Sequence, residues 1–314
     1  MYIRFLSGAV ALFALLAALI PLGHAANARK VIPLPGDRVF PESISATSDG
    51  TLYIGSAGAG GVLRAPPGAV KAEPWIAPGA FGSKSIFGVL ADVRSQILWV
   101  CSNDFSAAGS NGTLIAYDLK SGQGKFKANL PGQKTLCNDI AVGHDGSVYV
   151  SNSAAPQILK LNPQTKQLDI WLTDPQFQPK QGVGLDGIAV ASDGTVYVDT
   201  YTEGKFFRIP VSDGKPTATI LISISRPLVL ADALRPIWGD AFLLIEGAGR
   251  LDRITIEGTE AIVDTIGDGF NQPTGVARAN GTTWVAEGQL PYLFDPKKKN
   301  QKPKLPFRLV AVDY

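Results

Sequence analysis

The sequence predicts an all-β fold, and three observations support this prediction. Short apolar strands recur along the 314-residue chain, with equivalent positions 42 to 51 residues apart. Turns that contain glycine, asparagine or aspartate separate these strands, and beyond residue 28 no twelve-residue stretch shows a helical period. Four strands per repeat at this spacing are typical of a propeller blade, so we predict a six-bladed β-propeller of four-stranded antiparallel blades, closed by an N-terminal strand.

The first 28 residues are expected to lie outside this fold. Arg4 precedes an apolar run over residues 5–20, and small residues follow at Gly23, Ala25, Ala26 and Ala28. This arrangement is typical of a cleavable signal peptide. An uncleaved membrane anchor is the alternative, although the run is short for a membrane span. We therefore expect one propeller domain over residues 29–314, secreted or periplasmic, with no stable membrane span after cleavage.

Each predicted repeat opens at an equivalent position of its innermost strand. Three of these positions lie seven residues before the aspartate of an Asp-Gly turn, at Asp49, Asp145 and Asp193. A fixed register places equivalent residues at equivalent points of a repeated unit. The six register residues are Glu42, Phe87, Asn138, Asp186, Asp232 and Thr274.

The remaining strands of each repeat follow in order. Second strands rich in β-branched and aromatic residues are predicted over residues 51–54, 97–100, 147–150, 195–198, 241–244 and 283–286. Third strands that begin at glycine follow, for example over residues 112–117 and 204–209. The sixth repeat has a third strand over residues 307–312 but no clear fourth, and residues 30–34 are expected to supply it. Such closure would leave no unpaired inner edge.

Composition excludes several classes of function. With 29 basic and 27 acidic side chains the chain is nearly neutral, so nucleic acid is not expected as a partner. Two cysteines and two histidines are too few for a site that binds a soft metal. Cys101 and Cys137 could form a disulfide in an exported protein, and two buried free thiols are the alternative. We expect a monomer.

Four of the six register residues carry oxygen ligands. The carboxylates of Glu42, Asp186 and Asp232 and the amide of Asn138 suit a hard divalent cation: calcium first, magnesium or manganese next. Without a cation, converging carboxylates would repel one another and their pKa values would rise. Each residue alone is better explained as a strand-start residue that bonds nearby backbone. The four in one register favour a metal site.

This pattern resembles the senescence marker protein-30/gluconolactonase family, whose architecture is similar to that of the paraoxonases and the squid-type diisopropylfluorophosphatase. The resemblance spans the chain from about Val31 to Tyr314 and rests on short motifs around Glu42, Asn138 and Asp186. It implies a six-bladed propeller with a divalent metal, usually calcium, at the bottom of a central pocket. It also implies a small-molecule lactone, ester or organophosphate as the substrate.

The resemblance assigns roles to the ring. Glu42 stands where the family has a metal-binding glutamate, and Asn138 matches the asparagine of an Asn-Asp-Gly motif. Asp186 stands where asparagine is usual. Asp232 matches an aspartate thought to act as base or nucleophile, and Asn138 would help to position substrate or metal. The chain departs from the family at Ser43, at Asp186 and after Asp232, where glycine is missing.

Propeller geometry places further polar residues near the same mouth. The ends of the second strands bring there Asn103, Asp104, Asn152, Asp199, Tyr201, Glu203, Glu246 and Glu287. The segment over residues 288–306 is a candidate lid. We expect Phe87 to form an apolar wall of the substrate pocket; the alternative is that it simply packs in the channel. The residues that we expect to line the substrate pocket are Phe87, Thr274, Asp139, Tyr201 and Glu246.

Two function classes follow from these residues. The first is an exported metal-dependent hydrolase of lactones or esters, in which Asp232 activates water or attacks the carbonyl. The second is a non-catalytic propeller that binds a ligand or a partner protein around a structural metal. A Ser-His-Asp triad has no base, because His24 lies in the predicted signal peptide and His144 in a turn opposite the mouth.

Overall fold

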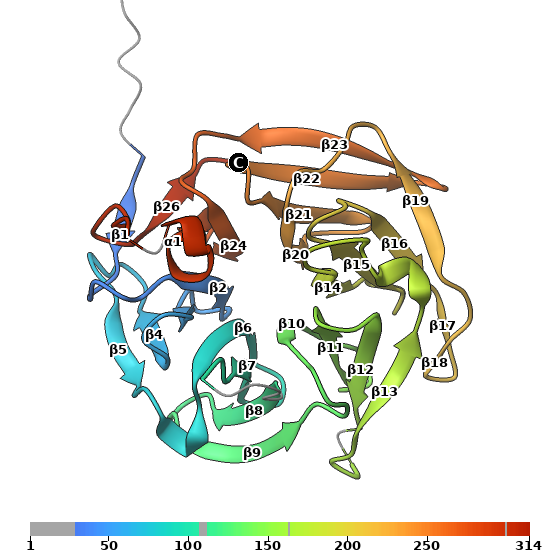
Figure 1. Ribbon diagram of the computed structural model, residues 1–314, viewed down its shortest axis with the longest axis horizontal. Helices are drawn as coiled ribbons and strands as arrows, with labels where there is room; N and C mark the ends of the chain where they lie inside the picture. The colour runs from blue at the N-terminus through green and yellow to red at the C-terminus, as the bar shows by residue number, and fades with distance from the viewer. Residues whose placement is uncertain (1–28, 107–111, 163, 299) are drawn as a thin grey trace, which may run out of the picture.

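The computed structural model describes residues 29–106, 112–162, 164–298 and 300–314 of the chain. In this part the chain forms four four-stranded sheets, one eight-stranded sheet and one two-stranded hairpin. The larger sheets surround a central axis (Figure 1): each four-stranded sheet has one edge strand near the axis, and the eight-stranded sheet has both of its edge strands there. The predicted signal peptide lies outside the described residues.

Three sheets follow the chain from the axis outward, and each is an antiparallel meander. Their strands are β2 (Pro41–Ala46), β3 (Leu52–Ser56), β4 (Val62–Ala65) and β5 (Glu73–Ile76); β6 (Ser85–Asp92), β7 (Ile97–Asn103), β8 (Thr113–Asp118) and β9 (Gly124–Asn129); and β10 (Cys137–Val142), β11 (Val148–Asn152), β12 (Gln157–Leu161) and β13 (Leu168–Thr173).

The next two meanders share one sheet, because β19 pairs in parallel with β23 through Ser223–Glu260 and Ile224–Ala261. Their strands are β14 (Leu185–Val190), β15 (Val196–Thr200), β16 (Phe206–Ile209) and β19 (Ile220–Ile224), then β20 (Ala231–Pro236), β21 (Ala241–Glu246), β22 (Arg250–Glu257) and β23 (Glu260–Gly267). The hairpin of β17 (Val211–Ser212) and β18 (Lys215–Pro216) joins β16 to β19.

The last sheet combines both ends of the described chain. Its strands are β24 (Pro273–Ala279), β25 (Thr282–Glu287), β26 (Arg308–Val312) and β1 (Val31–Pro33). β1 pairs antiparallel with β26, with Val31 opposite Val310. β26 corresponds to the strand predicted over residues 307–312, and β1 lies beside it at the edge of this sheet.

Helical segments are short in the described residues. They are η1 (Ala80–Gly82), η2 (Pro175–Phe177), α1 (Pro291–Phe294) and η3 (Pro296–Lys298). No helix in this part of the chain combines the length and the apolar character that crossing a bilayer requires.

The turns between first and second strands repeat one local structure. Asp49, Asp145 and Asp193 each accept a hydrogen bond at Oδ1 from the backbone amide two residues later, at 3.0, 2.9 and 2.8 Å. An aspartate that bonds its own turn in this way specifies the reversal locally. In these three repeats seven residues separate the register residue from the turn aspartate. The innermost strands before these turns therefore have the same length.

Apolar side chains fill the spaces between neighbouring sheets. Between β10–β13 and β14–β16, for example, Tyr149, Ile158, Phe177, Val198 and Phe207 are all buried. Such clusters also form between the other neighbouring sheets. Each innermost strand also lies against the innermost strands of its two neighbours, so polar residues at their starts come near one another around the axis.

Candidate functional site

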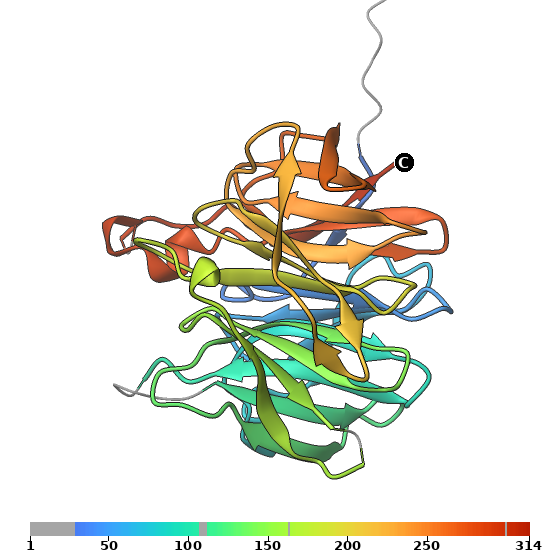
Figure 2. The ribbon, with the colours of Figure 1, turned by 90° about the vertical axis from the view of Figure 1, so that its right-hand side faces the viewer.

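A cavity of about 480 Å³ opens where the innermost strands begin. Five register residues from five different innermost strands line it: Glu42, Phe87, Asn138, Asp186 and Asp232. The loop that carries α1 lies over the same mouth and protrudes from one face of the ring (Figures 1 and 2). The other lining residues are Phe105, Leu136, Val183, Tyr201, Leu290, Pro291, Phe294 and Asp295.

A β-bulge marks the register position in every innermost strand. Pro41 of β2 lies opposite Ser56 of β3, and Ile44 lies opposite Ile54. Between these two pairs β2 therefore contains one residue more than β3. The same irregularity lies between Ile86 and Val89, Cys137 and Ile140, Leu185 and Ile188, Ala231 and Leu234, and Pro273 and Gly275. An extra residue bends the strand and redirects its side chain. The bulges explain how side chains at strand starts come to face the axis.

Glycine allows two of these strands to approach closely. A Cβ on Gly187, which follows Asp186, would lie 2.4 Å from the backbone oxygen of Asp232 and 2.4 Å from Oδ2 of Asp199. Such a separation is shorter than any non-bonded contact, so only glycine fits without moving its neighbours. The short approach brings Asp186 and Asp232 to the same cavity.

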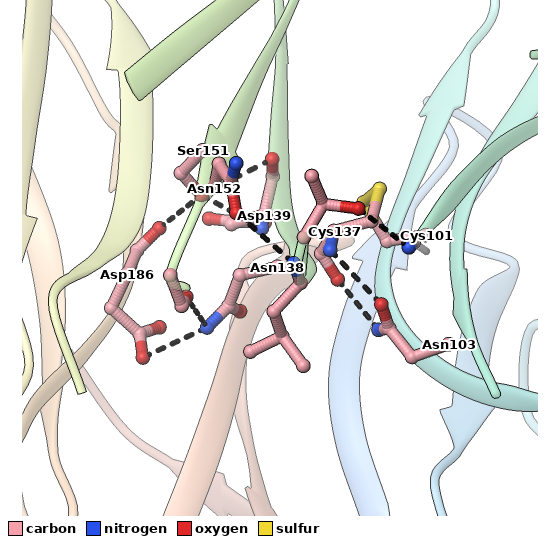
Figure 3. The surroundings of a disulfide bond; sticks show 12 residues. Cys101, Asn103, Cys137, Asn138, Asp139, Ser151, Asn152 and Asp186 are labelled. Carbon is pink, nitrogen blue, oxygen red and sulfur yellow. Dashed lines mark hydrogen bonds between the residues drawn. A yellow bond between two sulfur atoms is a disulfide. The ribbon is translucent and has the colours of Figure 1, made fainter. Parts of the chain in front are cut away.

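Hydrogen bonds fix the orientation of Asn138 within the ring. Its Nδ2 donates to Oγ of Ser153 at 2.7 Å and to Oδ2 of Asp186 at 3.0 Å (Figure 3). The Oγ of Ser151 donates to the backbone oxygen of Asp186 at 2.6 Å, which holds the start of β14 against β11. The amide nitrogen of Asn138 therefore points to Asp186, and its oxygen takes no part in these bonds.

A second group of charged residues lies beneath the ring. Arg235 donates from Nη1 to Oδ2 of Asp139 at 2.6 Å and from Nη2 to Oδ1 at 2.9 Å, and its Nη2 also donates to Oγ of Ser43 at 3.2 Å. Asp199 accepts a hydrogen bond from the Gly187 amide at Oδ1, while its buried Oδ2 has no hydrogen-bond partner among the residues that the structure describes. The centre of the ring thus holds five buried carboxyl groups and one guanidinium.

Burial and mutual repulsion raise the pKa of four of these carboxyl groups. Burial raises the pKa of Glu42, Asp186, Asp199 and Asp232 well above its usual range, and neighbouring negative charges raise it further. For Asp232 those charges are Asp186 first and then Glu42. Burial also raises the pKa of the Tyr201 phenol, with Asp232 the next contribution. The cavity floor therefore favours positive charge.

Three phenylalanine rings form the opposite wall of the cavity. Phe87 from β6 lies 5.7 Å from Phe105 and 5.9 Å from Phe294, and Phe105 lies 5.2 Å from Phe294, measured between ring centroids. Phe105 follows β7 and Phe294 ends α1. The predicted apolar role of Phe87 therefore belongs to a larger wall, and the predicted lid segment contributes one of its rings.

The structure places three predicted pocket residues away from the cavity. Thr274 donates from Oγ1 to the backbone oxygen of Pro41 at 2.8 Å, and this hydrogen bond joins β24 to β2. Asp139 lies beneath the ring in the ion pair with Arg235. Glu246 is fully buried and bonds Arg226 and Arg250. Its carboxylate is therefore used in ion pairs with the two arginines and does not line the cavity. Phe87 and Tyr201 do line the cavity.

A disulfide joins Cys101 and Cys137, with 5.1 Å between their Cα atoms, so the cysteines are not free thiols in this structure. Asn103 binds the same segment, because its Nδ2 donates to the Cys137 oxygen at 2.8 Å and its Oδ1 accepts from the Cys137 amide at 3.0 Å (Figure 3). These contacts link β7 to the start of β10. They hold the residue that precedes Asn138.

Several residues of the site are not predicted from the sequence. Arg235 could have been noticed in the sequence, because it is a charged residue three positions after a register residue. The other repeats have Ser, Leu or Ala at that position. Asp199 was expected near the rim and instead lies buried beneath the ring. Phe105 and Phe294 come from loops of no fixed length, and no repeat pattern predicts their approach.

The donor set suits a hard cation, although its side chains are not drawn together. Three carboxylates and an amide line one cavity, their pKa values are raised, and a buried oxygen of Asp199 lacks a partner. Oxygen ligands of this kind fit calcium or magnesium. Within the described residues, no three acidic, histidine or cysteine side chains are grouped closely enough to form a ready-made metal site. The oxygen ligands of the ring therefore fit a hard cation, but their side chains would have to move closer together to bind one.

No family model matches this chain, and no curated protein matches its sequence. Solved structures match its fold over most of its length. A gluconolactonase from Xanthomonas campestris is 17% identical with a TM-score of 0.63, over 92% of this chain and 93% of that chain. A luciferin-regenerating enzyme is 12% identical with a TM-score of 0.64, over 88% and 91%.

A third similar structure has a different activity. The PQQ-bound aldose sugar dehydrogenase from Streptomyces coelicolor is 15% identical with a TM-score of 0.59, and the match covers 90% of this chain and 96% of that chain. At such identities the likeness concerns the fold, which hosts several chemistries. The chain is thus a β-propeller whose structural neighbours include gluconolactonases and sugar dehydrogenases.

Proposed function

We propose that the chain is an exported, divalent-cation-dependent hydrolase of lactones or esters. In this proposal the chain is a six-bladed propeller closed by β1, and its site is the ring of register residues. The pairing of β1 with β26 supports the closure, and the likeness to a gluconolactonase supports the architecture. The Cys101–Cys137 disulfide supports export, since such bonds persist in oxidising compartments.

One observation carries the proposal: four oxygen-bearing register residues from four innermost strands line one cavity. Glu42, Asn138, Asp186 and Asp232 are spread over nearly 200 residues of sequence, and the bulges direct all four to the same space. A purely structural ring would be expected to pair its charges internally. Instead, Arg235 bonds Asp139 and leaves the four lining residues without a basic hydrogen-bond partner among the described residues.

Glu42, Asn138, Asp186 and Asp232 would hold the cation, with calcium preferred and magnesium or manganese as alternatives. When bound, the cation would supply a Lewis acid that polarises the substrate carbonyl and stabilises its developing negative charge. Asn138 would contribute through its oxygen, because its nitrogen already donates to Asp186. Asp186 in place of an asparagine adds a negative charge, which strengthens cation binding and weakens Lewis acidity.

The chain's own residues would supply the remaining chemistry. Asp232 would accept a proton from water at a carboxylate oxygen, or attack the carbonyl carbon directly. Its burial raises its pKa, which makes it a better proton acceptor than a carboxylate in water. The apolar wall of Phe87, Phe105 and Phe294 would exclude water from one side of the substrate.

The test combines metal analysis with turnover. The purified mature protein should hold one divalent ion and hydrolyse lactones or aryl esters, and chelation should abolish turnover. Asp232→Asn should reduce kcat by about a hundredfold or more while the protein remains folded, since proton transfer by a positioned group contributes roughly that factor. Asp240→Asn, which changes an exposed aspartate, is the matched control and should leave kcat unchanged.

Two other results would change the assignment. A bound ion without any turnover would favour the alternative function, a non-catalytic exported propeller that binds a ligand or partner protein around a structural metal. Loss of stability in Asp232→Asn, with turnover retained per folded molecule, would remove the catalytic role of Asp232.

A further inference from the structure

The wall of the cavity is an unusual surface for a protein in water. Phe105 is 52% exposed and Phe294 is 43% exposed, although both contact Phe87 and each other. Single exposed apolar residues are common and need no explanation. Three rings in mutual contact beside a cavity are different, because together they form an apolar patch of the kind that binds ligands.

The apolar character extends over most of the cavity lining. Leu136, Val183, Leu290 and Pro291 continue the wall that the three rings begin. Polar groups are confined to the ring of register residues on the floor and to Tyr201 and Asp295. A ligand in this cavity therefore meets hydrogen-bonding groups at the register residues, Tyr201 and Asp295, and hydrocarbon over most of the remaining lining.

The loop that contributes Phe294 is fixed at its base. Gln289 donates from Nε2 to the backbone oxygen of Lys304 at 2.9 Å, and its Oε1 accepts from the Lys304 amide at 2.8 Å. Gln289 itself is buried, with 1% of its surface exposed. These two bonds close the segment between the residues into a loop that carries α1. The position of the Phe294 ring is thus set by the structure of the loop.

This distribution of groups discriminates between substrates. A polyhydroxylated sugar lactone needs a donor or acceptor for each hydroxyl, and the wall of phenylalanine, leucine, valine and proline offers none. Hydroxyl groups buried without a partner weaken binding. An alkyl or aryl substituent would instead bury apolar surface against the rings. A cavity of about 480 Å³ is large enough for a ligand of that kind.

We propose that the substrate is a lactone or ester with an apolar, alkyl or aryl substituent, which packs on Phe87, Phe105 and Phe294 while its carbonyl faces the acidic floor. The identity of the reaction rests on the function proposed above, whereas the apolar nature of the ligand rests on the wall alone.

The test compares substrates that differ in polarity. Wild-type kcat/KM is measured for δ-gluconolactone, for δ-nonalactone and for phenyl acetate. We expect a preference of about tenfold or more for the two apolar substrates, a factor that a few buried methylene groups provide. Phe105→Ala and Phe294→Ala should each lower kcat/KM for δ-nonalactone by roughly three- to tenfold, the worth of an aromatic contact.

Control variants separate the wall from general stability. Phe294→Leu keeps an apolar side chain and should retain more δ-nonalactone turnover than Phe294→Ala. Trp238→Ala removes an equally exposed aromatic ring that does not line the cavity, and it should leave all three rates unchanged. A preference for δ-gluconolactone, or Phe→Ala variants with unaltered selectivity, would overturn the inference while leaving hydrolysis intact.

A binding measurement distinguishes failure of this inference from failure of the proposed function. The neutral dye Nile red should bind the wild-type protein, be displaced by δ-nonalactone but not by δ-gluconolactone, and bind Phe105→Ala/Phe294→Ala more weakly. If no substrate is hydrolysed and this displacement occurs, the hydrolase assignment fails and the apolar ligand site stands. If the dye binds both proteins alike, the apolar site is rejected whatever the turnover.

Discussion

Arg235 and Asp139 form a two-point ion pair at the centre of the ring, with N–O distances of 2.6 and 2.9 Å. The side chains are 13% and 5% exposed, and they come from β20 and β10. The pair thus joins two innermost strands that are separated by β14, in a cluster whose other carboxyl groups repel one another.

Replacing Arg235 with methionine should destabilise the protein by about 3–5 kcal/mol, because Asp139 would remain buried without its partner. The free energy of unfolding in urea measures the effect. Asp139→Asn in the same chain should recover part of the loss, since it removes the stranded charge. Arg64→Met, which breaks an exposed pair with Glu73, is the control and should cost less than about 1 kcal/mol. Equal losses in the two single variants would contradict this account.

Divalent cations should raise the melting temperature. Four buried carboxyl groups repel one another in the folded protein, so a cation that binds them stabilises the folded state. At a hundredfold excess over its Kd, a ligand adds about 2.7 kcal/mol. Thermal unfolding in calcium, in magnesium and in a chelator measures this. Asp186→Asn should reduce the calcium effect, and identical melting curves in all three conditions would argue against a cation site.

Removing the disulfide should cost roughly 4 kcal/mol by the chain-entropy relation, because it closes a loop between residues 36 apart in sequence. Urea unfolding of the wild type with and without reductant gives the difference. Cys101→Ser/Cys137→Ser should match the reduced wild type and should not respond to reductant. Asn103 still binds both backbone groups of Cys137, so we expect the start of β10 to keep its position in the folded variant. A reductant-insensitive wild type would refute the prediction.

The free energy of unfolding should decrease as the pH rises from about 4 to about 7, because Asp252 is protonated more readily in the folded protein than in the unfolded chain. Burial and its hydrogen bond with Glu246 raise the pKa of Asp252 to about 7. Burial would also raise the pKa of Glu246, but hydrogen bonds, the one from Arg250 foremost, outweigh it and lower that pKa to about 2. The folded protein therefore keeps a proton on Asp252 that the unfolded chain loses near its ordinary pKa, and the stabilisation is lost as pH rises through about 7.

The free energy of unfolding, measured in urea from pH 4.5 to 8, should show this component as a slope of up to about 1.4 kcal/mol per pH unit. Asp252→Asn should remove the slope and keep the acceptor for Arg226 and Thr265. Asp264→Asn, at a 44% exposed aspartate of the neighbouring strand, should keep it. A pH profile unchanged by Asp252→Asn would show that the proton is held elsewhere.

The repeat of the fold could be predicted from the sequence because its causes are local. Alternating strands, and turns in which Asp49, Asp145 and Asp193 bond the backbone two residues later, depend on neighbours in the chain. A fixed distance from turn to strand start then places Glu42, Asn138 and Asp186 at equivalent points. Equivalent points of the repeat lie around one axis, so oxygen ligands from different repeats are expected at one cavity.

Contacts between distant segments set which side chains face that cavity. Thr274 has the same register as Glu42, yet it bonds the oxygen of Pro41, a residue 233 positions away. Arg235 finds its partner Asp139 across 96 residues, and Phe105 meets Phe294 through two loops that belong to no repeat. The strands, their period and the chemical type of the ring residues follow from local sequence. Pairing of charges and the apolar wall were decided by contacts between distant segments, which no local period encodes.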